Sequence, residues 1–290
     1  MKQQATKDLL LLNLGMLFIS TSGVLGRYIK MSPELTIFWR TAIAATLLLG
    51  ICFWQGRSVW KNVRSDLGLL FIGGFLMAVH WVTYFYALHL SNVAIGMLSL
   101  FTYPILTAVL EPILLGTKFQ RIHLLLGILT IVGIYFLVPN EDVSGNHWKA
   151  IGMGSLSAAS YALRNILMKK PIQRHDGTKL MFYQTLTAAC LLFPFLLMQG
   201  TSGFVAQWEA ILFLALFTTV IGHTLFLLSF RRFSVTAASI MSCTQPIYGI
   251  ILGVLFLGEY PPLTTYIGGG LILTAVIVES YYSIRETRKD

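Results

Sequence analysis

Charged residues are scarce in this 290-residue sequence: they make up 11% of it, whereas hydrophobic residues make up 56%. A soluble domain carries roughly 25% charged residues, because its surface must face water. So few charged residues cannot cover the surface of a soluble globule of this length. The surface must therefore face lipid instead of water. The composition therefore excludes an ordinary soluble domain and predicts an integral membrane protein.

Cysteine and the common catalytic motifs are also rare or missing. The three cysteines, Cys52, Cys190 and Cys243, are widely spaced within apolar runs, which excludes a disulfide framework and a CxxC metal motif. The sequence has no phosphate-binding loop, no His-Glu-x-x-His pair and no Gly-x-Ser-x-Gly elbow. We therefore expect no catalytic residue, no metal site, no cofactor and no enzymatic activity.

Long apolar runs dominate the sequence. A membrane helix needs about 20 mostly apolar residues, and the runs lack the alternation of barrel strands. They are separated by breakers such as Ser32-Pro33, Pro139-Asn140, Lys170-Pro171 and Pro261-Pro262. We predict an all-α fold with ten transmembrane helices, over residues 8–26, 33–54, 67–87, 92–115, 120–138, 148–168, 178–198, 207–229, 234–257 and 262–280.

Lysine and arginine predict the orientation. With a cytoplasmic N-terminus, the inside segments hold sixteen of these residues and the outside segments only Arg27, Lys30 and Lys149. Short cytoplasmic loops carry such an excess of positive charge. We therefore expect both termini in the cytoplasm, and we interpret the net charge of +9 as a topology signal rather than a nucleic-acid surface.

The two halves of the chain resemble each other. Residues 91–116 align with 233–258 at an offset of 142, and 38–41 align with 182–185 at an offset of 144. An odd number of helices per half forces the halves to insert with opposite orientation. We therefore predict one membrane domain of two inverted repeats, divided near residue 146 into residues 1–146 and residues 147–290. Such repeats are typical of secondary transporters, whose substrate site lies near the membrane midplane.

Several of these features together resemble one known family. They are the arginine of Trp39-Arg40-Thr41 early in the second helix, the prolines of the fourth and ninth helices, and the ending Leu257-Gly258-Glu259. The pattern resembles the drug/metabolite transporter superfamily, and within it the EamA-type ten-helix members, over essentially the whole chain. One departure is that the fourth helix ends in Leu115-Gly116-Thr117, without the acidic residue.

The resemblance implies a secondary transporter in a bacterial cytoplasmic membrane, with helices 1–4 and 6–9 around a central cavity and helices 5 and 10 peripheral. It favours export of amino acids or their derivatives by alternating access. The alternative is a transporter that imports or exchanges a vitamin, a sugar derivative or an organic anion. A membrane enzyme is a more remote alternative. The expected partners are a small-molecule substrate and the lipid bilayer, with no nucleic acid, and the chain is expected as a monomer or weak dimer.

Five ionisable residues within the predicted helices, where such groups are costly, are candidates for a functional role. Arg40 is either an anion anchor, because a guanidinium clamps a carboxylate with two parallel hydrogen bonds, or half of a structural ion pair. Glu111 is a candidate proton carrier, substrate-amine partner or arginine counter-ion. Arg164 is expected to extend toward the cytoplasmic surface or to join an ion pair, and His223, near the repeat position of His80, is a further proton-coupling candidate.

The remaining candidates are predicted to line the cavity. His80 has Trp81 and Tyr84 close by on its helix, which indicates an aromatic wall with one titratable group, although a hydrogen-bonded histidine in a helix interface is the alternative. Pro104 and Pro246 occupy equivalent centres of the fourth and ninth helices and are candidate hinges. The predicted substrate-binding set is Arg40, His80, Trp81, Tyr84, Tyr103, Tyr161, Gln184 and Gln245.

Overall fold

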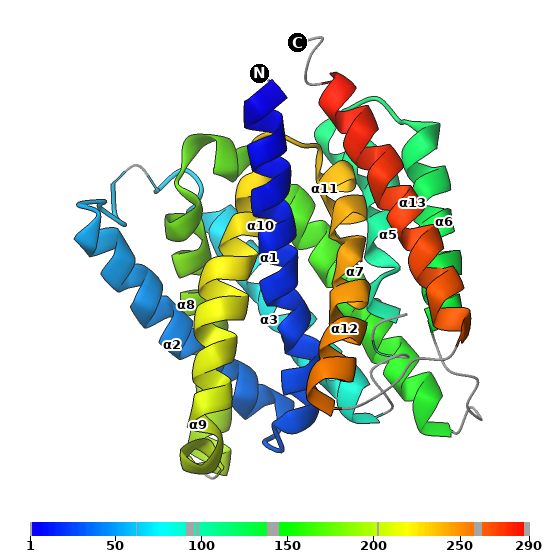
Figure 1. Ribbon diagram of the computed structural model, residues 1–290. Helices are drawn as coiled ribbons and strands as arrows, with labels where there is room; N and C mark the ends of the chain where they lie inside the picture. The colour runs from blue at the N-terminus through cyan, green and yellow to red at the C-terminus, as the bar shows by residue number, and fades with distance from the viewer. Residues whose placement is uncertain are drawn as a thin grey trace.

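The computed structural model describes residues 2–61, 63–90, 96, 99–137, 145–201, 203–257 and 263–286. Within these ranges the regular structure is helical, with no strand, and Figure 1 shows the helices gathered into one bundle. Most of 91–98, together with Pro139-Asn140, Gly258-Glu259 and Pro261-Pro262, lies outside the described residues, so the expectations that rest on those positions are not tested.

The described helices follow the predicted order of apolar runs. In chain order they are α1 (Lys2–Tyr28), α2 (Pro33–Trp54), α3 (Leu67–Leu90), α5 (Tyr103–Leu115), α6 (Arg121–Leu137), α7 (Gly145–Arg174), α8 (Gly177–Gln199), α9 (Phe204–Phe213), the π-helix η1 (Leu214–His223), α10 (Thr224–Ser229), α11 (Val235–Met241), the 3₁₀ turn η2 (Ser242–Thr244), α12 (Gln245–Leu257) and α13 (Leu263–Glu286).

Membrane-spanning length and apolar composition occur in six segments of the described chain, which confirms the membrane fold. They are Thr6–Tyr28, Pro33–Trp54, Leu67–Leu90, Gly177–Gln199, Phe204–Ser229 and Val235–Phe256. Tyr103–Leu115, Arg121–Gly133 and Tyr266–Tyr282 are shorter apolar helices. The start of α1 and the end of α13 lie at the same end of the bundle (Figure 1).

One predicted boundary is wrong. The sequence predicts that the sixth helix ends before Lys170-Pro171, but α7 continues through Pro171 to Arg174. Proline removes one backbone hydrogen bond in a helix, and here tertiary bonds hold the turn that follows it. Arg231 donates to the carbonyl of Ile172 at 2.9 Å and to that of His175 at 2.8 Å. The side chain of Arg231 therefore stabilises the C-terminal end of α7, which the local sequence alone would place earlier.

The fourth and ninth predicted helices are both interrupted at their prolines. α5 begins at Tyr103, after a turn at residues 101–102, so Pro104 occupies its first turn. In the ninth helix, η2 separates α11 from α12, and α12 begins at Gln245, directly before Pro246. Proline fits the first turn of a helix because its missing N–H has no partner there. The α-helical pattern is thus interrupted at positions that the sequence alignment of the two halves pairs with each other.

Helices from opposite halves pack closely against each other. The main pairs are α3 with α7, α2 with α8, α1 with η1, and α6 with α13. Glycines permit the close approach: a Cβ on Gly74 of α3 would lie 2.5 Å from Cβ of Thr187 in α8, and one on Gly15 would lie 3.1 Å from the Gly222 carbonyl. Small residues bring membrane helices together in this way. In Figure 1, α6 and α13 lie together at one side of the bundle.

The loops at the end of the bundle that holds the N-terminus are tied together by charges. Asp66, which precedes α3 and is 2% exposed, accepts from Arg174 at 2.8 Å and from His175 at 2.6 Å. Arg57 forms an ion pair with Asp176. Because Asp66 is buried and both of its oxygens have partners, the cluster fixes the α2–α3 loop against the α7–α8 loop at this end.

Candidate functional site

A small cavity lies in the middle of the bundle, where helices from both halves meet. Its volume is about 20 Å³, room for about one water molecule. Its walls come from α1, α2, α3, α5, α7, η1 and α12, and its floor includes residues just before α5. The lining residues are Ile19, Ser20, Ser22, Arg40, His80, Trp81, Tyr84, Leu100, Phe101, Tyr103, Tyr161, His223 and Gln245.

Arg40 brings a positive charge into this cavity. Its side chain is 1% exposed, and its Nε donates to Oγ1 of Thr219 at 2.7 Å. The guanidinium carbon lies 4.5 Å from the ring centre of Trp81, within cation–π range. Nη2 has no hydrogen-bond partner, and no carboxylate of the described chain forms an ion pair with Arg40. The structural ion pair that the sequence left open is thus not found among the described residues.

Ser157 of α7 holds the ring of His80 and fixes its proton. The Ser157 hydroxyl donates to the His80 carbonyl at 2.9 Å, so its single proton is used there. His80 Nδ1 lies 2.8 Å from the same hydroxyl and 3.3 Å from the Ser157 carbonyl, which can only accept. Nδ1 therefore carries the ring proton. In the neutral ring, Nε2 is then left as an acceptor.

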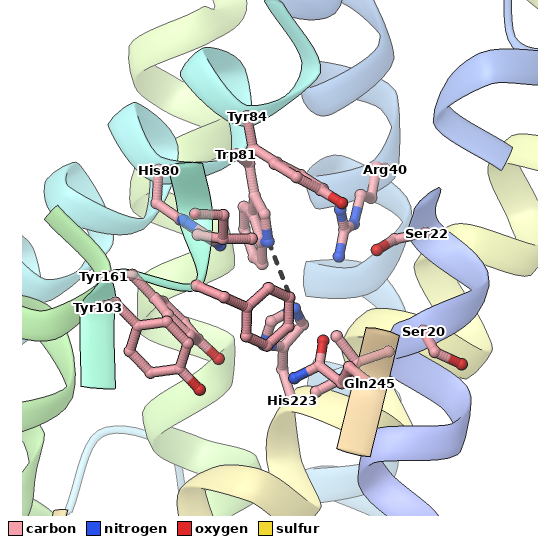
Figure 2. A pocket seen from close by; sticks show the side chains of 13 residues that line it. Ser20, Ser22, Arg40, His80, Trp81, Tyr84, Tyr103, Tyr161, His223 and Gln245 are labelled. Carbon is pink, nitrogen blue, oxygen red and sulfur yellow. Dashed lines mark hydrogen bonds between the residues drawn. The ribbon is translucent and has the colours of Figure 1, made fainter. Parts of the chain in front are cut away.

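Trp81 fixes the proton of the second histidine in the same way. The indole Nε1–H, which can only donate, points to Nε2 of His223 at 3.4 Å, as the dashed line in Figure 2 marks. Nε2 must therefore accept, so the neutral ring of His223 carries its proton on Nδ1. Nδ1 has no hydrogen-bond partner. His223 thus presents an unused donor within the buried site.

Aromatic rings form the rest of the wall. The ring of Tyr161 stacks on His80 with centres 4.2 Å apart and meets Tyr103 edge-on at 5.0 Å. The Tyr103 hydroxyl hydrogen-bonds to Ser242 in η2. Gln245, the first residue of α12, donates to the sulfur of Met16 at 3.2 Å. The two helix interruptions therefore place Tyr103 and Gln245 on the cavity, as Figure 2 shows.

Two predicted site residues pair with each other away from the cavity. Arg164 donates to Gln184 at 2.6 Å and to Asn165 at 2.9 Å, and neither Arg164 nor Gln184 is among the lining residues. The expectation that Arg164 extends to the cytoplasmic surface is wrong, because its side chain is 0% exposed. The physical reason is that α8 supplies amide and thioether partners, from Gln184 and Met181, inside the bundle.

Glu111 also lies outside the cavity and caps a helix of the other half. Its carboxylate accepts from the backbone N–H groups of Val235 and Thr236, at 2.9 and 2.7 Å, and from the Thr236 hydroxyl at 2.6 Å. These are the first residues of α11, whose N–H groups have no partner within the helix. A carboxylate at a helix N-terminus is stabilising. The contacts give Glu111 a described structural task, and its proposed role in proton coupling stays a prediction.

The sequence analysis did not identify the residues that hold the predicted site side chains in place. Thr219 accepts from Arg40 and donates to the Leu214 carbonyl five residues earlier, a spacing that belongs to the π-helix η1. Nothing in the local sequence predicts a π-helix, although π-helical segments are frequent at functional sites. Ser157 was missed because a single serine in an apolar helix is common; Ser20 and Ser22 carry no stronger signal.

The family model of the EamA-like transporter family matches this chain twice, over residues 6–138 and 148–281. One solved structure superposes with a TM-score of 0.81 over 97% of this chain and 98% of that chain, at 17% sequence identity, which shows a shared fold. The two family matches together cover most of the sequence.

Named relatives agree with this match. An uncharacterized transporter of Archaeoglobus fulgidus is 27% identical over 77% of this chain and 78% of its own length. The inner membrane transporter YicL of Salmonella typhimurium is 25% identical, with 92% and 93% covered, and the pseudopaline exporter CntI of Pseudomonas aeruginosa is 26% identical, with 84% of each covered. With its apolar helices, the protein is a multi-pass cell-membrane protein, and it belongs to the EamA-like transporter family of the drug/metabolite transporter superfamily.

Proposed function

We propose that this transporter moves small metabolites by alternating access through the central cavity, with export of amino acids or their derivatives as its physiological direction. The observation that carries the proposal is the cavity itself, buried at the meeting point of the two halves and lined by charged, polar and aromatic side chains. A cavity with room for about one water molecule cannot hold a metabolite, so helices must move apart to admit one. Export is supported by the name of the relative CntI.

The same proposal includes ten membrane spans arranged as two inverted repeats, with both termini in the cytoplasm. Placement of the N-terminal and C-terminal helix ends at one end of the bundle supports an even number of crossings (Figure 1). The packing of α1 on η1 and of α3 on α7 supports it too, because each joins the first helix of one half to the third of the other. Such an interface is where repeat transporters bind substrate.

Counterflow in proteoliposomes tests the proposed function. Purified protein is reconstituted with an internal pool of unlabelled amino acids or related metabolites, and uptake of labelled compound is followed. Saturable uptake that depends on the internal pool is expected of a carrier. Uptake that neither saturates nor depends on the internal pool contradicts alternating access.

His80→Ala supplies the site-directed part of that test. It removes the stacking on Tyr161 and the hydrogen bonds to Ser157, and we expect counterflow to fall more than tenfold while the amount of folded protein is retained. His89→Ala, on the same helix but exposed, is the matched control and is expected to transport normally. Normal kinetics of His80→Ala would remove this residue from the transport site.

A further inference from the structure

The charge of the cavity is unbalanced. Arg40 is the only fixed charge among the lining residues that the structure describes, and no aspartate or glutamate is among them. Arg164 lies three residues after the lining residue Tyr161 on α7, and its partners in the described chain are Gln184, Asn165 and Met181, all neutral. A buried charge without an opposite charge is costly. The centre of this bundle therefore holds positive charge that the described protein does not neutralise.

The hydrogen-bonding groups without a partner in the cavity also favour a ligand that is negatively charged or rich in acceptors. Nη2 of Arg40 can only donate, and the ring proton of His223 is placed on the unpartnered Nδ1 by the indole of Trp81. Both side chains are buried, so water does not satisfy these donors from the surface. A buried donor without a partner costs about 1–3 kcal/mol. A ligand that offers oxygen acceptors removes this cost, whereas a ligand that offers donors does not.

Both donors belong to side chains that contact the same indole ring. Arg40 lies against the face of Trp81, with its guanidinium carbon 4.5 Å from the ring centre, and His223 meets the same indole through its Nε1–H. Figure 2 shows both side chains next to Trp81, with Ser20 and Ser22 of α1 nearby. Arg40 is held at Nε by Thr219, which leaves the outer end of its guanidinium free to bind a ligand. A carboxylate is the acceptor group that matches a guanidinium edge.

We propose that the cavity recognises the carboxylate of substrates with net negative charge, through Arg40 Nη2 and His223 Nδ1–H, and that it prefers organic acids to amino acids of the same skeleton. This inference rests on the proposed transport function and shifts its preferred substrates from amino acids to the organic-acid derivatives of the same skeleton. An amino acid brings an ammonium group as well, and the lining residues offer it no carboxylate. Replacing that ammonium by a hydroxyl removes the unmatched positive charge.

Three pairs of compounds test the preference, because the members of each pair differ only in hydroxyl against ammonium: L-lactate and L-alanine, 3-phenyl-L-lactate and L-phenylalanine, and L-malate and L-aspartate. Counterflow of each labelled compound is measured in the same proteoliposomes. We expect the acid to exchange at least tenfold faster than its amino acid in at least one pair, and the amino acid to be faster in none. The ratio within a pair does not depend on how much protein is folded.

Variants of Arg40 and His223 test whether these two side chains recognise the substrate as proposed. Arg40→Gln is expected to lower the ratio of acid to amino-acid exchange at least tenfold, and Arg40→Lys, which keeps the charge but loses the planar edge, to lower it less. His223→Phe keeps a ring against Trp81 and removes the Nδ1–H; because both members of a pair carry the carboxylate, we expect it to slow the exchange of both and to leave the ratio near the wild-type value. Unchanged exchange rates in this variant would remove His223 from the carboxylate site. Arg164→Gln is the comparison variant, since it removes a buried arginine that adds to the central positive charge but does not line the cavity, and it is expected to lower the ratio less than Arg40→Gln does.

The outcomes separate the two proposals. Amino acids that exchange as fast as their acids, or an unchanged ratio in Arg40→Gln, overturn the anion preference and leave the transporter proposal intact. No exchange of any of the six compounds or of the metabolite pools overturns both. An equal drop in the ratio for Arg164→Gln and Arg40→Gln also overturns the assignment to Arg40, because it indicates a general electrostatic effect.

Discussion

Replacement of Glu111 by glutamine distinguishes a helix cap from a proton carrier. The carboxylate accepts three hydrogen bonds at the start of α11, two of them from backbone N–H groups. A glutamine has one acceptor oxygen, and its NH₂ group must face one of these donors. We therefore expect Glu111→Gln to leave a buried N–H without a partner and to weaken the attachment of α11 to α5.

The size of the effect follows from two contributions. A buried donor left without a partner costs about 1–3 kcal/mol, and loss of a negative charge at a helix N-terminus costs about 0.3–1 kcal/mol. The sum is a loss of roughly 1–4 kcal/mol, which corresponds to a fall in Tm of about 3–12 °C for a chain of this size.

Thermal unfolding of the purified protein in detergent measures this effect. Glu209→Gln is the matched control, because Glu209 is an exposed acid on α9, and its Tm is expected to stay within about 1 °C of the wild type. A wild-type Tm for Glu111→Gln, combined with counterflow that has lost its pH dependence, would refute the capping argument and support proton coupling through Glu111.

Two further changes probe packing and the ionic cluster at the N-terminal end. Gly74→Ala is expected to cost about 1–3 kcal/mol by overpacking, because its Cβ would lie 2.5 Å from a side chain of α8, whereas Gly152→Ala, with nothing within 4 Å, should leave Tm unchanged or raise it. Asp66→Asn removes the carboxylate that pairs with the half-exposed Arg174 and with the buried His175. In a Cys190→Ser background it should speed thiol labelling of the buried Cys52 several-fold, and an unchanged labelling rate would show that the cluster does not hold this end closed.

The sequence predicted the membrane fold and most of the cavity because both leave strong local signals. In lipid, the backbone polar groups of an apolar run of about 20 residues are satisfied when the run forms a helix. Ionisable residues in such runs are expensive enough to indicate the interior of the bundle. Of the predicted substrate-binding residues, Arg40, His80, Trp81, Tyr84, Tyr103, Tyr161 and Gln245 line the cavity, together with His223.

The contacts that the sequence did not reveal join segments far apart in the chain. Gln184 pairs with Arg164, and Glu111 caps α11, because each finds a partner on a helix that the local sequence does not identify. The extension of α7 past Pro171 depends on Arg231, more than fifty residues later. Repeat alignment is also a limited guide here: it pairs Arg40 with Gln184, yet only the first of these lines the cavity.

The π-helix η1 has a consequence for comparisons between relatives. Its i→i+5 pairing holds more residues per turn than an α-helix, and both Thr219 and His223 reach their partners from within it. Because the wider turn absorbs an extra residue, deleting one residue from Leu214–His223 would restore ordinary helical pairing and leave the flanking segments facing the same way. Neighbouring positions of an α-helix face about 100° apart. In a relative without this extra residue, an ungapped alignment would therefore match His223 with a side chain that faces a different direction.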